Sequence, residues 1–257
     1  MIKLKTNNDK VFYIPSSWSE VTFKQWKDLI HSNNEMEMLS ILSGLEIDII
    51  NRIKESDLIK LSVCISFVKH PLKIENYSAP GKIVINKNVS IPLITDIGEQ
   101  SFGQKVYFHE LLKSGSDNII ELLPELILTY GQPYIDKSDF DLNRLIELVP
   151  SFDNIFFVDL YATALNYIEQ LNAIIEIEKE HLSTKPTNEQ VAAGVNMFEE
   201  FGVMNTIKAL ANGNILNYEK VLKIEYNTVF NHMRMNKTES IFQENYRKVM
   251  EQKHKRK

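Results

Sequence analysis

The side chains that commonly do chemistry are present in this sequence, but their spacing matches no catalytic or metal-binding pattern. The six histidines are spread along the chain, and no two stand at ligand spacing on one predicted helix. His109 and Glu110 are followed by Leu-Leu-Lys, so the H-E-x-x-H pattern of zinc proteases is absent. The nine glycines stand singly and form no glycine-rich phosphate loop. The order of serine, histidine and aspartate residues alone indicates no catalytic triad.

One short stretch resembles the start of a calcium-binding loop. Asp139, Asp141 and Asn143 alternate as oxygen ligands do in such a loop. However, Arg144 stands where a glycine is needed, and Pro150 stands where a bidentate glutamate belongs. Asp139 is therefore predicted to cap a helix instead. We predict no catalytic residue, no metal site and no cofactor, with an enzyme as the residual alternative.

Composition narrows the class of protein further. The chain has 257 residues, a net charge of −5 and a pI of about 5.8. Nucleic acid is not an expected partner, because a general nucleic-acid binder is usually strongly basic. No run approaches the ~18 apolar residues that span a bilayer, so we expect no membrane partner. Cys64 is the only cysteine, which excludes a disulfide within the chain and favours a reducing compartment.

The clearest local signal is the capping box formed by Thr22 and Gln25, which predicts that a helix begins at Phe23. Trp26 lies on the apolar face of this helix. It is either a core anchor or an anchor for a partner protein. A second short helix follows, and Gly44 is placed to end it in a left-handed conformation.

The remaining pattern predicts a mainly α fold with small β-hairpins (α+β). Hairpins are expected at residues 2–14, around Asn7-Asn8-Asp9, and at residues 82–91. The order of hairpin, S/T-x-x-Q box and helix occurs at residues 11–30 and again at 83–112, where Ser101 and Gln104 form the second box. This echo reflects either a structural duplication or the frequency of capping boxes.

Several helices are expected between and after these hairpins. We expect a buried helix at 57–68, a helix at 119–130 stopped by Gly131-Gln132-Pro133, and a long helix at 153–182. Glu176, Glu178 and Glu180 are expected to form a solvated face near its end. Further helices are expected at 188–201, 204–211, 218–235 and 240–250.

The polar segment at residues 184–187 contains a proline and predicts a linker. The predicted organisation is a mainly helical domain with two hairpins and the long helix at 1–183, and a small helical module with a basic tail at 188–257.

Three fragments carry a resemblance to known proteins: IPSSWSEVTFKQWKDL with the later LSILSG, IIELLPELILTYGQPYI with the later FFVDLY, and FEEFGVMNTIKALANGNILNYEKVLKIEYNTVF. They resemble proteins encoded in the structural-gene region of tailed bacteriophages, particularly those of Bacteroidetes hosts. Proteins of this kind are often taken to be tail-assembly chaperones. The resemblance implies a protein that binds apolar helical segments of a tape-measure or other tail protein, in the host cytoplasm or the virion.

The resemblance covers no motif that assigns a functional residue, so the candidates for a partner contact come from the apolar side chains themselves. Such binding uses exposed apolar faces and adaptable methionines, although ordinary core packing is the alternative for each of them. The other phage structural proteins are the expected partners, and self-association is a further expectation. Two other classes stay open: a structural virion protein (adaptor, ring or plug), and a nucleic-acid-linked regulator that uses the basic tail at 253–257. The candidate partner-binding residues are Trp26, Met197, Phe198, Phe201, Met204, Phe230 and Met233.

Overall fold

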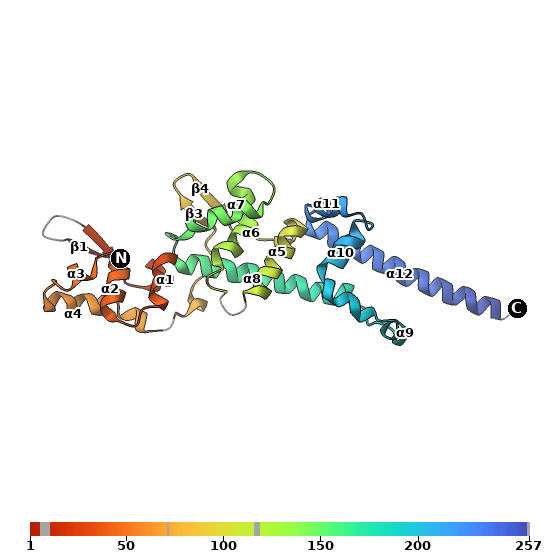
Figure 1. Ribbon diagram of the computed structural model, residues 1–257, viewed down its shortest axis with the longest axis horizontal. Helices are drawn as coiled ribbons and strands as arrows, with labels where there is room; N and C mark the ends of the chain where they lie inside the picture. Colours follow the sequence, from red (N-terminus) through yellow and green to blue (C-terminus); the bar gives the residue numbers. More distant parts are fainter. Residues whose placement is uncertain (6–10, 71, 116–118, 256–257) are drawn as a thin grey trace. The chain divides into compact units, whose positions relative to one another are not determined.

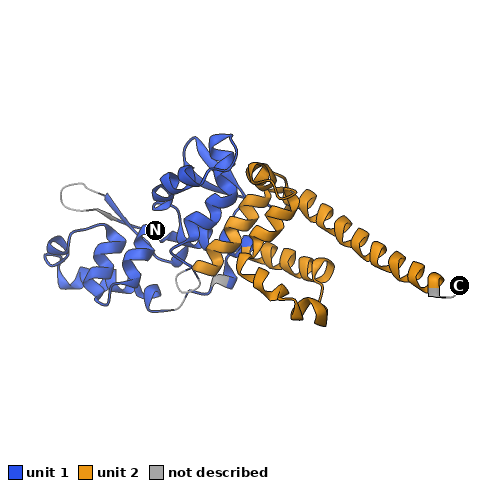
Figure 2. Cartoon of the chain, turned by 45° about the vertical axis from the view of Figure 1, so that its right-hand side comes forward, with its two compact units in different colours: residues 1–94, 115–167 blue, residues 95–114, 168–257 orange. Residues whose placement is uncertain are grey.

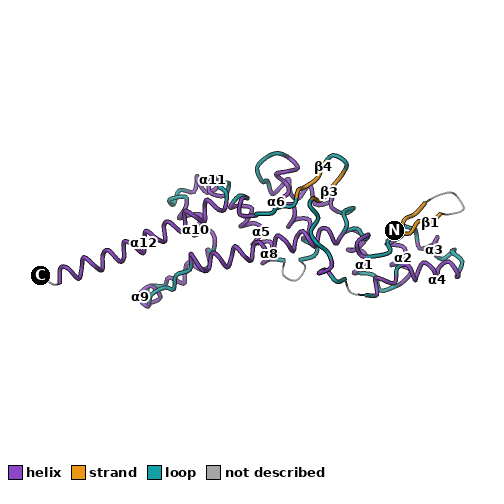
Figure 3. The backbone as a smooth tube through the Cα atoms, turned by 180° about the vertical axis from the view of Figure 1, so that it is seen from behind, coloured by secondary structure: helices purple, strands orange, loops and turns teal. Residues whose placement is uncertain are grey.

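The computed structural model describes residues 1–5, 11–70, 72–115 and 119–255. These residues form mainly helices with two antiparallel two-stranded sheets, which confirms the predicted fold class (Figures 1 and 3). The chain divides into two compact units (Figure 2). Unit 1 comprises Met1–Ile94 and Gly115–Tyr167, and unit 2 comprises Thr95–Ser114 and Ile168–Lys257.

Unit 1 contains both sheets and most of the short helices. In the first hairpin Ile2 pairs with Ile14, and in the second Ile83 pairs with Ile91. The turn expected at Asn7-Asn8-Asp9 lies outside the described residues. The elements of unit 1 are β1 (Ile2–Lys5), β2 (Val11–Ile14), η1 (Trp18–Glu20), α1 (Phe23–Ile30), α2 (Glu35–Ser43), α3 (Ile47–Ile50), α4 (Glu55–Cys64), η2 (Ser66–Lys69), η3 (Ile74–Asn76), β3 (Lys82–Asn86), β4 (Val89–Pro92), α6 (Leu123–Asp136), α7 (Leu142–Leu148), η5 (Val149–Phe152) and the first part of α8 (Phe157–Leu182).

The capping box at the start of α1 is present as predicted. Thr22 Oγ1 accepts a hydrogen bond from the amide of Gln25, and Gln25 Oε1 accepts one from the amide of Thr22. The Gln25 side chain also donates to the carbonyl of Leu42 at 3.1 Å, which joins α1 to α2. Gly44 ends α2 with φ of +68°, as expected.

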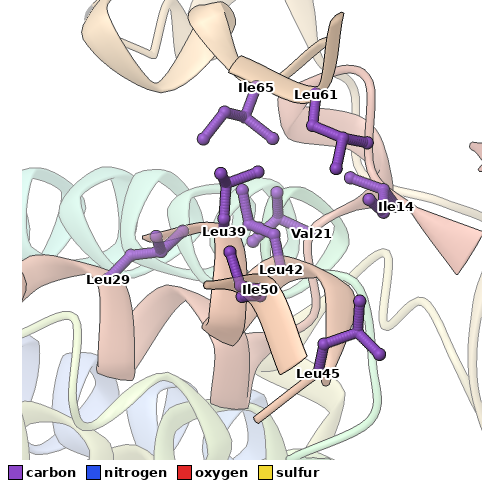
Figure 4. Packing of buried hydrophobic residues seen from close by; sticks show 9 residues of the cluster. All are labelled: Ile14, Val21, Leu29, Leu39, Leu42, Leu45, Ile50, Leu61 and Ile65. Carbon is purple, nitrogen blue, oxygen red and sulfur yellow. The ribbon is translucent and has the colours of Figure 1, made fainter. Parts of the chain in front are cut away.

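Apolar side chains from β2 and α1–α4 meet in one core cluster (Figure 4). Burying such side chains is the main favourable contribution to folding. Trp26 is half-buried and packs against this cluster. The buried members are Ile14, Val21, Leu29, Leu39, Leu42, Leu45, Ile50, Leu61 and Ile65.

The structure corrects three predictions in unit 1. The helix expected at 57–68 ends at Cys64, and it is not buried on most sides, because Ile59 and Val63 are exposed. The Gly131-Gln132-Pro133 segment does not stop a helix but lies inside α6. The cap of α7 is Asp141, not Asp139, because Asp141 Oδ1 accepts from the amides of the first turn.

The long helix α8 ends at Leu182 as predicted but begins only at Phe157, because the preceding residues pair with the start of α1. Phe23 donates its amide proton to the carbonyl of Ile155 at 2.8 Å, and Phe157 donates to the carbonyl of Val21 at 2.9 Å. This short antiparallel bridge fixes the beginning of α8 against the beginning of α1 within unit 1.

Unit 2 repeats this local arrangement around the second capping box, residues 101–104. Phe102 donates its amide proton to the carbonyl of Ile224 at 2.7 Å, and Tyr226 donates to the carbonyl of Gln100 at 2.8 Å. The order of hairpin, capping box and helix therefore recurs as predicted, together with the same bridge to a later helix. These shared contacts favour a structural duplication over chance.

Apart from α5, α8 and α12, the elements of unit 2 are short helices. Residues 183–187 contain no helix or strand, and the predicted division into domains at 184–187 stays a prediction. The two helices expected at 218–235 and 240–250 are wrong: a break at 223–225 separates α11 from one continuous helix, α12. The elements of unit 2 are η4 (Ile97–Glu99), α5 (Phe102–Ser114), the rest of α8, α9 (Asn188–Ala192), η6 (Val195–Phe201), α10 (Val203–Leu210), η7 (Ile215–Asn217), α11 (Tyr218–Leu222) and α12 (Tyr226–Lys255).

Candidate protein-binding surface

Helix α10 is anchored in the core of unit 2 by one of its faces. Val203, Ile207 and Leu210 follow at spacings of four and three, so they share a face. Ile207 is buried in the core cluster of unit 2, and the other two pack against it. Met204 lies on a different side of α10 and is 47% exposed. These core contacts hold α10 in place and leave Met204 exposed to solvent.

The 3₁₀ helix η6 places two phenylalanines on one exposed side. Phe198 and Phe201 are three residues apart, and side chains at this spacing eclipse one another in a 3₁₀ helix. Their side chains are 60% and 52% exposed. The side-chain amide of Asn205 donates to the carbonyl of Phe198 at 2.6 Å, which ties η6 to α10.

Glycines at both ends of η6 permit this arrangement. Gly194 has φ of +84° and Gly202 has φ of +45°, conformations that side chains with a Cβ rarely adopt. A Cβ at Gly194 would lie 3.0 Å from Met197 Sδ, so Met197 packs over this backbone position while remaining 73% exposed. We call Met197, Phe198, Phe201 and Met204 the η6–α10 surface.

Acidic side chains border the η6–α10 surface. Glu199 and Glu200 are exposed on η6 between the two phenylalanines in the sequence. Beside Phe198 lies an open hollow of about 480 Å³, whose lining includes Glu199 and Gly202. An apolar surface with carboxylates beside it suits a partner helix that carries both apolar and basic side chains.

The other three predicted partner-binding residues take part in packing. Trp26 stacks on Phe157 in unit 1. Phe230 is 9% exposed in the core cluster of unit 2, where its ring stacks on that of Tyr226, and Met233 packs against the same cluster. Their role in partner binding stays a prediction, and four of the seven residues carry the surface described above.

No family assignment follows from comparison with known proteins. The chain matches no protein-family model, no curated protein and no solved structure.

A polar cluster inside unit 2 corrects the expectation of a solvated glutamate face on α8. Lys105 Nζ lies 2.9 Å from both carboxylate oxygens of Glu178, and the Tyr226 hydroxyl donates to Glu178 Oε1 at 3.0 Å. The Glu178 side chain is only 22% exposed, whereas Glu176 and Glu180 are exposed as predicted. Burial and the nearby Glu178 charge raise the pKa of Tyr226, so its phenol stays a neutral donor.

This polar cluster is satisfied internally and has the character of a structural ion pair. Lys105 and Glu178 meet in a bidentate contact, and the Tyr226 ring lies 5.3 Å from Lys105 Nζ. Within the described residues no group of three histidine, cysteine, aspartate or glutamate side chains is placed to hold a metal ion. None of the described helices has the length and apolarity that a membrane span requires.

Sequence reasoning missed further exposed apolar residues in unit 2. Ile215 and Leu216 of η7 are 71% and 81% exposed. A longer series follows on α12, and its spacing of seven, four and three residues was a detectable signal. The break predicted at 236–239 divided this apolar series between two helices, so its regular spacing was not recognised. The members are Met235, Phe242, Tyr246 and Val249.

Proposed function

We propose that this protein is a tail-assembly chaperone-like factor of a tailed bacteriophage, which binds apolar helical segments of a tape-measure or other tail protein in the host cytoplasm. The η6–α10 surface is the observation that supports this proposal most directly. Four large apolar side chains lie exposed on a segment of eight residues. Exposed apolar side chains concentrated in this way commonly mark protein-interaction sites.

The chemistry of the η6–α10 surface suits reversible binding of varied helical segments. Phe198 and Phe201 offer rigid aromatic area, while Met197 and Met204 are flexible and polarizable, and adapt to partners of different shape. An amphipathic helix docks by laying its apolar face on such a surface. Because the surface is small and open, it favours release when other tail subunits compete for the same segment.

The neighbouring carboxylates add a preference among client segments. Glu199 and Glu200 would attract lysine or arginine side chains on the client, and such rim charges act mainly on the association rate. We therefore expect binding to slow as ionic strength rises, while the apolar contact retains the complex.

A pull-down with the tail proteins of the same phage tests the proposal. The wild-type chain should retain a tail protein, and the double variant Phe198→Ser/Phe201→Ser should lose it. Ile59→Ser is a matched control, because Ile59 is also 60% exposed but lies on α4 in unit 1. Failure of the wild-type chain to retain any tail protein would contradict the proposal.

A structural virion protein is the alternative from the same phage setting. Quantitative mass spectrometry of purified virions separates the two functions. A chaperone should be absent or far below the stoichiometry of the tail-tube subunits, whereas an adaptor, ring or plug protein should be present at a fixed copy number.

A further inference from the structure

The distal segment of α12, residues 235–254, lacks cover from the rest of unit 2. The start of α12 is buried, since Tyr226, Val229 and Phe230 belong to the core cluster. Beyond residue 237 every position through His254 is exposed. In Figure 2 this part of the helix runs clear of the other elements of unit 2. Most helical stability in proteins comes from tertiary packing of an apolar face, so a helix segment without such packing indicates a partner.

The distal segment carries a narrow apolar stripe. Met235, Phe242 and Val249 recur every seven residues, and Tyr246 lies one turn after Phe242 on the same side. All four are between 49% and 69% exposed, and the rings of Phe242 and Tyr246 stack with centroids 6.1 Å apart. A seven-residue apolar repeat is typical of a helix that pairs with another helix.

The opposite side of the distal segment carries charged side chains that pair with one another. Glu244 pairs with Lys248 at 2.6 Å, and Arg247 lies 3.7 Å from Glu251. These pairs stabilise a solvated helix face. Two charged residues, Glu239 and Lys253, lie close to the apolar stripe. Its other neighbours are mainly uncharged and include Thr238, Gln243, Asn245 and Gln252.

We propose that the distal segment pairs with the same segment of a second copy of this chain, in antiparallel orientation. Charge distribution along the helix selects the occupant and the direction. Of the charged residues of the distal segment, Glu239 and Lys253 lie nearest the apolar stripe. A parallel pair would place Glu239 beside Glu239 and Lys253 beside Lys253 of the two copies, while an antiparallel pair brings Glu239 of each copy towards Lys253 of the partner subunit.

An antiparallel pair centred on residue 244 brings the aromatic positions together. Phe242 of each copy lies opposite Tyr246 of the partner subunit, so the two aromatic layers form the centre of the contact. In this register Glu239 lies opposite Val249 of the partner subunit, about one turn from Lys253 of the partner subunit. Both arrangements follow from the sequence spacing of this single helix.

Comparison of α12 with α8 supports a covering partner for the distal segment. In unit 2 the distal part of α8 is covered, because Leu171 is buried and Ile174 and Leu182 pack on the core cluster. The later helix that is bridged to the first capping box, α8, thus uses its distal part for packing. The later helix that is bridged to the second box, α12, extends in the same way without such cover.

Analytical ultracentrifugation of the full chain tests the pairing. The wild-type chain should dimerise, and Phe242→Glu/Tyr246→Glu should raise the dissociation constant by roughly tenfold or more. Ser240→Glu adds a charge on the opposite side of the helix and should leave the dimer intact. A chain that stays monomeric up to about 100 µM would overturn the proposal.

Cysteine cross-linking in a Cys64→Ser background tests the orientation. A mixture of Phe242→Cys and Tyr246→Cys chains should give a mixed disulfide in preference to either homodimer. Preferential homodimer disulfides would overturn the antiparallel arrangement. Charge exchange gives an independent reading: Glu239→Lys or Lys253→Glu alone should weaken the dimer, and the two together should restore it.

Discussion

The indole ring of Trp26 stacks on the phenyl ring of Phe157 with centroids 4.5 Å apart and an interplanar angle of 3°. Trp26 is the fourth residue after the first capping-box threonine, and Lys105 is the fourth after the second capping-box serine. In unit 2, Lys105 Nζ lies over the ring of Tyr226 at 5.3 Å. The two capping-box segments thus share a contact between the helix that follows the box and the start of a later helix, and this contact is apolar in unit 1 and charged in unit 2.

Replacing Trp26 by alanine should destabilise unit 1. The substitution removes the stacked pair and leaves a space beside the core cluster, so we expect a loss of about 3 kcal/mol in the free energy of unfolding. Chemical denaturation measures this, and the exposed Lys24→Ala on the same helix is the control. A stable Trp26→Ala variant that fails to bind a client would instead show that Trp26 is a partner anchor.

Breaking the Lys105–Glu178 pair should destabilise unit 2. Lys105→Met leaves Glu178 buried without its cation, and Glu178→Gln leaves the Lys105 ammonium without its carboxylate. We expect each variant to lose about 3 kcal/mol, because an unpaired buried charge costs more than the pair contributes. The double variant Lys105→Met/Glu178→Met should recover most of the loss in a double-mutant cycle. Additive losses in the double variant would contradict this.

Local signals in the sequence predicted local structure well. The Thr22 and Ser101 boxes and the left-handed Gly44 depend only on residues a few positions apart, and all were confirmed. Phe198 and Phe201 were identified as candidates because they are apolar residues of the small helical module predicted at 188–257, yet the sequence did not show that Phe230 of the same module is buried. Burial depends on which segments meet.

Contacts between distant residues explain the remaining errors. Because Ile155 and Phe157 pair with the residues at the start of α1, α8 begins only at Phe157. No local pattern in the sequence reveals a pairing between segments so far apart. The same holds for Glu178, whose neighbour Lys105 lies on another helix. At Gly131 the sequence indicated a helix stop, whereas the structure uses this glycine to bring β4 close to α6.

Gly131→Ala should destabilise unit 1 through that close approach. A Cβ at residue 131 would lie 2.7 Å from Cδ1 and 2.8 Å from Cγ2 of Ile91, whose side chain is fully buried and has little room to move. We expect a loss of about 2 kcal/mol from overpacking, although alanine favours a helix. Adding Ile91→Val should relieve the clash and restore part of the stability in thermal unfolding. A Gly131→Ala variant more stable than the wild type would show that β4 moves freely.

Glu125 should make the stability of unit 1 depend on pH. Its Oε2 atom is buried without a hydrogen-bond partner among the described residues, and burial raises the pKa of this carboxyl above its ordinary value of 4.5, against a smaller opposing effect of its own backbone amide and of Lys27. In the unfolded chain Glu125 loses its proton first as pH rises. The contribution of Glu125 to stability is therefore full below pH 4.5 and falls as pH rises through the folded-state pKa.

Glu125→Gln tests this dependence because it removes the charge and keeps the shape. The variant should be more stable than the wild type at pH 7, and the difference should shrink towards pH 4. Urea denaturation at several pH values between these limits measures both trends. Glu121→Gln, at an exposed position just before α6, should change neither the stability nor its pH dependence. A constant difference between Glu125→Gln and wild type across this range would mean that the carboxylate is solvated in the folded state.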